Sequence, residues 1–308
     1  MKLLKIRKKA LIDWLFLVSL SFVLSMLSIG LKYPIDLETY TTLSSLNLLD
    51  SIKVFNFIEL GSYIFIALVP KVLGLNPEFY LVFLSISIAL YITSRIDSFG
   101  GRVAFIFMSL GFYGSNLMFS QYKMLLSVFF FIIINEHLFS YKRAGYSKIL
   151  SLGGFLFHTQ SILYTIAAWF RLRWLVVFSI ALFFLFKPLL FSLLHYYPDV
   201  YVFSKVYTYL SFEVDGLTYF SYIRLFLFLS IFSLSSFFCK KDFYLKCYTF
   251  CVLISLAMWP FPIISGRIVS MAFILEALVV YKGRSALIKN VYLIFAVFIT
   301  GVRYFGQI

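Results

Sequence analysis

Long, unbroken runs of apolar residues are the feature that most constrains how this chain folds. Many of these runs approach the length of about 20 residues that an α-helix needs to cross a bilayer. They are continuous and do not alternate with a period of two residues, which excludes an outer-membrane barrel. Of the 308 residues, 62% are apolar and 13% are charged, whereas a soluble domain is about half apolar and about a quarter charged. The sequence therefore predicts an all-α, polytopic integral membrane protein in which residues 1–308 form a single transmembrane domain.

The helix length also predicts the number of spans, which is about ten transmembrane helices, give or take one. The apolar runs cover about residues 10–31, 57–73, 79–94, 103–119, 124–139, 149–170, 174–194, 217–238, 247–264, 268–281 and 291–304. We expect two of these runs to be broken or re-entrant helices, because polar or helix-breaking residues interrupt them. They are 57–73, with Glu59 and Pro70, and 149–170, with Gly153, Gly154 and His158.

The basic residues gather in the links between the runs, and they predict the orientation. The net charge of +14 fits cytoplasmic loops that face anionic lipid rather than a nucleic-acid-binding protein. Five basic residues precede the first run and two follow it, so we expect a retained first span with a cytoplasmic N-terminus. The polar segments 32–56 and 195–216 are then expected to be periplasmic loops. Simple alternation places the basic 142–148 link outside, against the positive-inside rule, unless a broken run fails to cross.

His158 is the clearest candidate for a site residue, because it lies inside an apolar run. Its neighbours Thr159, Gln160 and Ser161 are polar, and glycines precede it. An ionisable residue at such a position is costly unless it is paired or hydrated. The surroundings favour a hydrated cavity, and a neutral histidine that bonds between helices is the alternative.

Two arginines also lie within apolar runs. Arg224 is about two turns into the run 217–238, and Arg267 follows a segment that two prolines and Gly266 are expected to interrupt. A guanidinium beside irregular backbone suits phosphate recognition, because its planar fork binds two oxygens at once. The alternative is an arginine that extends to the membrane surface.

Smaller polar features lie at the ends of the runs. Gln121 and Lys123 form a short polar link that is either a plain connection or a substrate contact, and Glu59 is either interfacial or functional. The sequence has no metal-ligand spacing, no phosphate-binding glycine loop with lysine and no Gly-x-Ser-x-Gly motif. We therefore expect no metal and no cofactor, and a substrate that arrives already activated.

Four short motifs occur in an order that is similar to one known family. They are Ile35-Asp36-Leu-Glu-Thr-Tyr40, Glu59-Leu-Gly-Ser-Tyr63, Phe157-His158-Thr-Gln-Ser161 and Gly266-Arg267. Together they resemble the EpsG-like, Wzy-type polymerases of bacterial surface polysaccharides, such as O-antigen or capsule. The chain departs from the family by one inserted position before Ser161, and by Gln121-Tyr122-Lys123 where the family has an Arg-Gln pair.

The resemblance implies a GT-C-like glycosyltransferase, multi-pass in the bacterial inner membrane, with its chemistry at the periplasmic face. It would move a growing glycan from undecaprenyl pyrophosphate to a sugar hydroxyl of the next lipid-linked repeat unit. Asp36 or His158 would act as the base, of which we favour Asp36, with His158 orienting the acceptor; Arg267 would stabilise the leaving pyrophosphate. The residues expected to bind substrate are Tyr40, Glu59, Gln121, Lys123, Gln160 and Arg224.

The partners implied are the undecaprenyl-pyrophosphate-linked oligosaccharide, membrane lipids, a chain-length regulator and a flippase, with no nucleic acid. Three other functions stay open. One is a lipid-linked oligosaccharide flippase or other transporter, which a missing internal repeat disfavours. Another is a membrane O-acyltransferase, and the last is a non-enzymatic scaffold or channel.

The first testable prediction concerns the segment 32–56. A cysteine introduced at Ser45, in a variant without native cysteines, should react with a membrane-impermeant thiol reagent in cells with a permeabilised outer membrane. A cysteine at Ser285, in a basic link, should react only after the inner membrane is broken. Reversed labelling of the two positions would contradict the assigned orientation.

Overall fold

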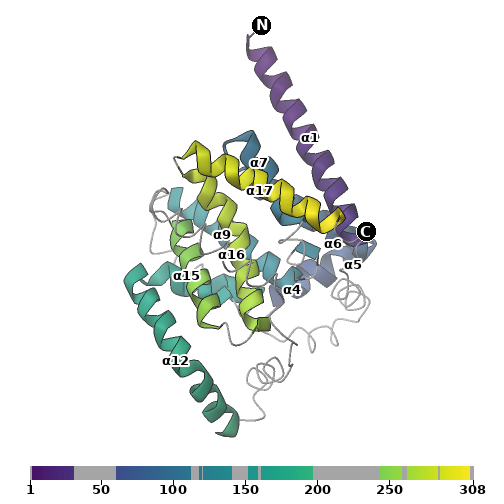
Figure 1. The fold of residues 1–308 in the computed structure, drawn as a ribbon. Helices are drawn as coiled ribbons and strands as arrows, with labels where there is room; N and C mark the ends of the chain where they lie inside the picture. Colours follow the sequence, from purple (N-terminus) through teal and green to yellow (C-terminus); the bar gives the residue numbers. More distant parts are fainter. Residues whose placement is uncertain are drawn as a thin grey trace.

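The computed structural model describes residues 2–30, 60–111, 118–119, 121–140, 152–158, 161–196, 243–258, 262–283 and 285–305. All regular structure within these ranges is helical, which confirms the all-α prediction (Figure 1). Among these residues, one helix is long and apolar enough to cross a membrane, over Ala10–Gly30. The segment 32–56 and nearly all of 195–216 lie outside the described ranges.

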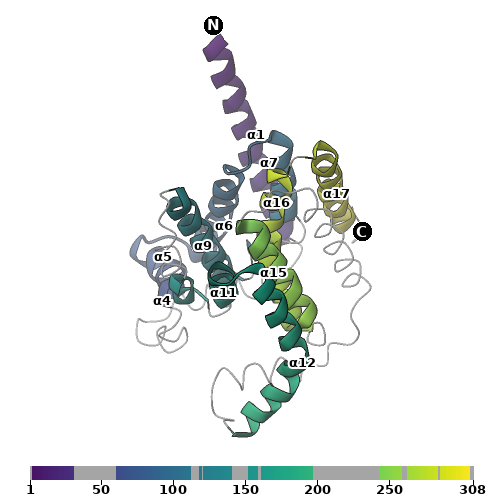
Figure 2. The same ribbon diagram turned by 90° about the vertical axis from the view of Figure 1, so that its left-hand side faces the viewer.

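The helices fall into a central bundle with two projecting ends. The elements are α1 (Lys2–Gly30), α4 (Leu60–Tyr63), the π-helix η2 (Ile64–Leu68), α5 (Val69–Val72), α6 (Pro77–Thr93), α7 (Phe99–Ile106), the π-helix η3 (Phe107–Gly111), α9 (Tyr122–Ser140), the 3₁₀-helix η4 (Leu152–Leu156), α11 (Ile162–Trp169), α12 (Leu172–Tyr196), α15 (Phe243–Ala257), α16 (Pro262–Lys282) and α17 (Ala286–Phe305). The N-terminal part of α1 extends beyond the bundle, and α12 extends away from it on the opposite side (Figures 1 and 2).

Contacts of α7 fix the relative directions of the first helices. The guanidinium of Arg102, near the start of α7, lies 5.5 Å from the ring centre of Trp14. The Ser28 hydroxyl, near the end of α1, donates to the Leu110 carbonyl at the end of η3, so α1 and α7 run parallel. The Arg102 Nε also donates to the Ile96 carbonyl at 2.7 Å, just after α6. Helix α6 therefore ends where α7 begins.

Helices α15 and α16 form an antiparallel hairpin. Near its turn the hydroxyls of Ser255 and Ser265 lie 2.8 Å apart, and each also donates to the other residue's carbonyl. At its open end the Lys282 ammonium lies 4.2 Å from the ring centre of Tyr244.

The open end of the hairpin lies beside the start of α7. A Cβ added to Gly101 would lie 2.5 Å from the Tyr281 ring. The described residues thus bring Arg95, Arg102, Lys246 and Lys282 to the same end of the bundle, and we call it the basic end.

The local signals of the sequence have mixed outcomes. The predicted helix start at Asn76 is confirmed, because its side chain accepts from the backbone N–H of Glu78 at 2.9 Å. The interruption at Pro70 is wrong, since the chain stays helical over Leu60–Val72. The π-helix η2 just before Pro70 widens the turn that its ring would otherwise crowd. The interruption expected from two prolines and Gly266 is confirmed at Pro262, which begins α16 after α15 ends at Ala257, but it is wrong at Gly266, which lies inside α16.

The predicted break in the run 149–170 is confirmed. This run divides into the short helix η4 and the eight-residue helix α11. The chain between them packs on α4, where the Ser62 hydroxyl donates to the Phe157 carbonyl at 2.6 Å. Gly61 lets the two backbones approach, since a Cβ there would lie 2.9 Å from the Leu156 carbonyl oxygen.

The second prediction follows from this approach. Gly61→Ala should destabilise the protein by about 1–3 kcal/mol, because the added methyl meets backbone that cannot rotate away. Gly301→Ala is the matched control, since nothing lies within 4 Å of its Cβ position, and alanine favours a helix over glycine by up to about 1 kcal/mol. Thermal unfolding of the purified variants in detergent measures both; equal unfolding temperatures would contradict the close packing of α4 on η4.

Candidate functional site

Three helices meet at the side chain of Tyr164 on α11. Its hydroxyl donates to the Met271 carbonyl of α16 at 2.9 Å. Its ring stacks on Phe131 of α9, with the ring centres 4.4 Å apart. Tyr164 is 1% exposed, so this contact lies in the interior and joins α9, α11 and α16.

Helices α9 and α16 both begin at the end of the bundle opposite to the basic end. Helix α16 does so because it ends at the basic end. The end of α11 lies near the start of α15, since the Phe170 carbonyl accepts from the Lys246 ammonium at 3.1 Å. The Ser85 hydroxyl of α6 donates to the Met118 carbonyl, shortly before α9. Farther along both helices, the Tyr91 ring of α6 contacts the Phe129 ring of α9. The contacts follow the same order in both segments, so α9 runs parallel to α6 and toward the basic end.

Ser161 and Arg267 lie on the facing sides of α11 and α16. Ser161 is three residues before Tyr164, and Arg267 is four residues before Met271, so each shares a helix face with the residue that makes the contact. They lie about 4.5 Å and about 6 Å from the contact, each along its own helix axis. Gln121 and Lys123 lie at the start of α9, about 12–15 Å along that helix from Phe131. We call the region of Gln121, Lys123, His158, Ser161 and Arg267 the site end.

His158 lies in the break between η4 and α11, and the backbone around it is tightly held. Its N–H donates to the Gly154 carbonyl at 3.1 Å, and its carbonyl accepts from the Ser161 N–H at 3.0 Å. The preceding Phe157 ring packs between Phe65 and Phe130, at ring-centre distances of 5.9 and 5.0 Å. The His158 side chain is partly buried at this position.

Two buried polar atoms at the site end lack a hydrogen-bond partner among the described residues. They are the hydroxyl of Ser161, a residue that is 2% exposed, and the Oε1 atom of Gln121. Buried polar groups are normally paired, so these two atoms are available to a ligand or to water. Ser161 was not among the predicted site residues, although it ends the Phe157–Ser161 motif.

The arrangement at the site end suits an anionic ligand. The starts of α9 and α16 present partial positive charge toward this end of the bundle. Lys123 and Arg267 add two full charges, and both side chains are partly buried. No group of three His, Cys, Asp or Glu side chains within the described residues could hold a metal.

Four of the nine predicted site residues lie within the described residues: Gln121 and Lys123 at the start of α9, His158 just before α11, and Arg267 in α16. The other five lie outside the described residues and stay predictions; they are Asp36, Tyr40, Glu59, Gln160 and Arg224.

Comparison with known proteins adds no further constraint. No family model, no curated protein and no solved structure matches this chain. The resemblance to the EpsG-like polymerases therefore stays a hypothesis that rests on the four motifs.

The third prediction tests the convergence of α11 and α16. Cysteines at Ser161 and Arg267, in a variant without native cysteines, should be joined by a short bifunctional thiol reagent. The pair Ser161 and Lys282 is the matched control and should stay unjoined, because Lys282 lies about 22 Å farther along α16. Mobility of the denatured protein on a gel reports the cross-link, and equal cross-linking of both pairs would contradict the assigned helix directions.

Proposed function

We propose that this protein is a polytopic membrane glycosyltransferase that polymerises lipid-linked glycan units. The observation that carries the proposal is the meeting of α9, α11 and α16 at Tyr164, with Lys123 and Arg267 on the first halves of α9 and α16 and the unpartnered Ser161 hydroxyl at the start of α11. Cations and helix N-termini around hydroxyl-binding groups suit a sugar substrate whose leaving group is a pyrophosphate. The four motifs support the same substrate class.

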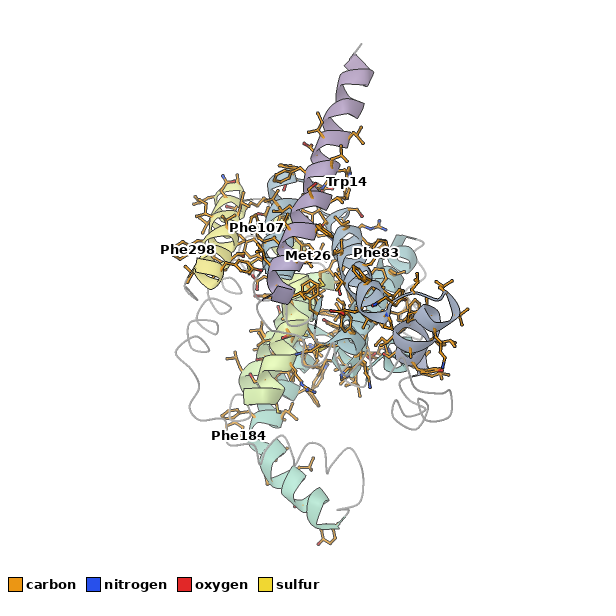
Figure 3. All side chains as sticks on the ribbon, turned by 90° about the vertical axis from the view of Figure 1, so that its right-hand side faces the viewer. Trp14, Met26, Phe83, Phe107, Phe184 and Phe298 are labelled. Carbon is orange, nitrogen blue, oxygen red and sulfur yellow. The ribbon has the colours of Figure 1, made fainter. Side chains whose placement is uncertain are left out.

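The distribution of polar and apolar side chains supports a membrane location. Large apolar side chains point outward, among them Phe83, Phe184 and Phe298, which are 68%, 69% and 67% exposed (Figure 3). The interior contains fully buried hydroxyls instead, such as those of Ser21 and Ser85. A chain in water would bury the aromatic rings and expose the hydroxyls, whereas hydrocarbon accepts this arrangement.

The helix directions support the proposed orientation. Helix α1 ends at the site end and α6 begins there, so the chain between them returns to the side it left. The segment Leu60–Val72 is about 20 Å long, less than the hydrocarbon thickness of about 30 Å, which fits a re-entrant helix. Helix α9 then ends at the basic end, so the 142–148 link follows a helix that ends with the other basic residues. This arrangement agrees with the positive-inside rule.

The proposed reaction is a transfer at the anomeric carbon. The acceptor hydroxyl oxygen forms a bond to this carbon, the bond to pyrophosphate breaks, and the pyrophosphate leaves with the bonding electrons. A base takes the hydroxyl proton as the new bond forms.

In this reaction Arg267 and Lys123 stabilise the negative charge that develops on the leaving group. Asp36 is the favoured base, and His158 orients the acceptor sugar. Gln121 and Ser161 would donate or accept hydrogen bonds from sugar hydroxyls. The remaining substrate-binding proposals are Tyr40, Glu59, Gln160 and Arg224.

The fourth prediction tests Arg267 in proteoliposomes supplied with labelled lipid-linked repeat units. Arg267→Ala should reduce polymer formation by about 10²–10³-fold, the loss typical of removing one group that stabilises transition-state charge. Arg267→Lys should be nearly as damaging, because it keeps the charge but loses the bidentate fork.

Arg95→Lys is the matched control, because this exposed arginine lies at the basic end and should leave polymer formation unchanged. Full-length polymer from both Arg267 variants at normal abundance would contradict the role of Arg267. Transport of the labelled lipid across the bilayer without any polymer would instead favour a flippase.

A further inference from the structure

A carboxyl group lies buried where α15, α16 and α17 meet, toward the basic end and apart from the proposed site. Glu276 of α16 is 1% exposed, Tyr248 of α15 is fully buried, and Tyr292 of α17 is 3% exposed. The Tyr248 hydroxyl donates to Glu276 Oε2 at 3.5 Å. Glu276 Oε1 and the Tyr292 hydroxyl have no hydrogen-bond partner within the described part of the chain. We call these three residues the Glu276 cluster.

The ionisable groups of the surrounding helices do not neutralise this carboxyl. They are Tyr244 and Lys246 on α15, Tyr281 and Lys282 on α16, Lys289 on α17 and Arg102 on α7. Lys282 lies over the Tyr244 ring, and the Lys246 ammonium and the Arg102 Nε each donate to a backbone carbonyl. The Tyr281 hydroxyl donates to the Lys289 carbonyl at 3.0 Å. Within the described ranges, no basic side chain forms an ion pair with Glu276.

The Glu276 cluster accommodates a protonated Glu276 carboxyl better than a carboxylate. Burial of a carboxylate without a counter-charge is costly, whereas a neutral acid is tolerated when it is hydrogen-bonded. A proton on Oε1 also makes this atom a donor, and the nearby Tyr292 hydroxyl oxygen can accept from it. One proton thus provides a partner for both unpaired atoms.

We propose that the Glu276 cluster is a proton-binding site, and that a neutral carboxylic acid joins α16 to α15 and α17. Loss of the proton leaves a charge between the helices and weakens the packing of α17. Helix α17 in turn contacts η3, where the Thr300 hydroxyl donates to the Phe107 carbonyl at 3.3 Å. The basic end therefore contains a pH-sensitive contact that is independent of the proposed glycan chemistry.

Infrared difference spectroscopy of the purified protein near neutral pH tests the bound proton directly. Wild type should show the C=O band of a protonated carboxylic acid, and Glu276→Gln should lack it. Glu78→Gln is the matched control, because Glu78 is an exposed carboxyl at the start of α6; this variant should lose carboxylate bands and keep the acid band. Loss of carboxylate bands in Glu276→Gln would overturn the proposal.

Unfolding temperature against pH supplies a second readout. Wild type should lose stability relative to Glu276→Gln as the pH rises from about 5 to about 9, whereas Glu78→Gln should follow wild type. Stability that depends on sodium rather than choline at fixed pH would overturn the proton in favour of a metal cation. If Glu276→Gln does not accumulate, Tyr292→Phe should shift the acid band of wild type, and an unshifted band would contradict the pairing with Tyr292.

Discussion

The contact of Tyr164 with two neighbouring helices is the interaction on which the site end depends. Its hydroxyl donates to a main-chain carbonyl rather than to a side chain, so it fixes the position of α11 along the axis of α16. The hydrogen bond contributes about 1 kcal/mol, and the stacking on Phe131 about as much beyond the burial of its area. The contact matters more for position than for stability, because it fixes which part of α16 lies against α11.

Many buried hydroxyls donate to a carbonyl of their own helix, and this makes the exceptions informative. Ser21, Thr93 and Ser179 each donate to the carbonyl four residues earlier in the same helix. This pattern lets a helix carry polar side chains into an apolar interior without a partner on another helix. Against that background, Ser161 and Glu276 stand out, because each has a buried oxygen with no hydrogen-bond partner among the described residues.

The sequence predicts the features of this fold that depend on neighbouring residues alone. The helix start at Asn76 and the break near His158 are of this kind, and both were predicted correctly. The predicted interruption at Pro70 is wrong because a π-helix lies just before it. The amino-acid composition of this segment does not indicate a π-helix. The positions of Gln121, Lys123, His158 and Arg267 depend on helix directions that are set by distant contacts such as Ser85 to Met118 and Gly101 to Tyr281. The four motifs lie far apart in the chain and carry no information on these contacts.

The serine pair at the turn of the α15–α16 hairpin has a consequence for the order of assembly. Ser255 and Ser265 are close in sequence, so closing the turn between them costs little chain entropy and the hairpin can form as soon as its own residues are made. Helix α17 follows the hairpin in the chain and supplies Tyr292 to the Glu276 cluster. The hairpin can therefore form before this cluster is complete.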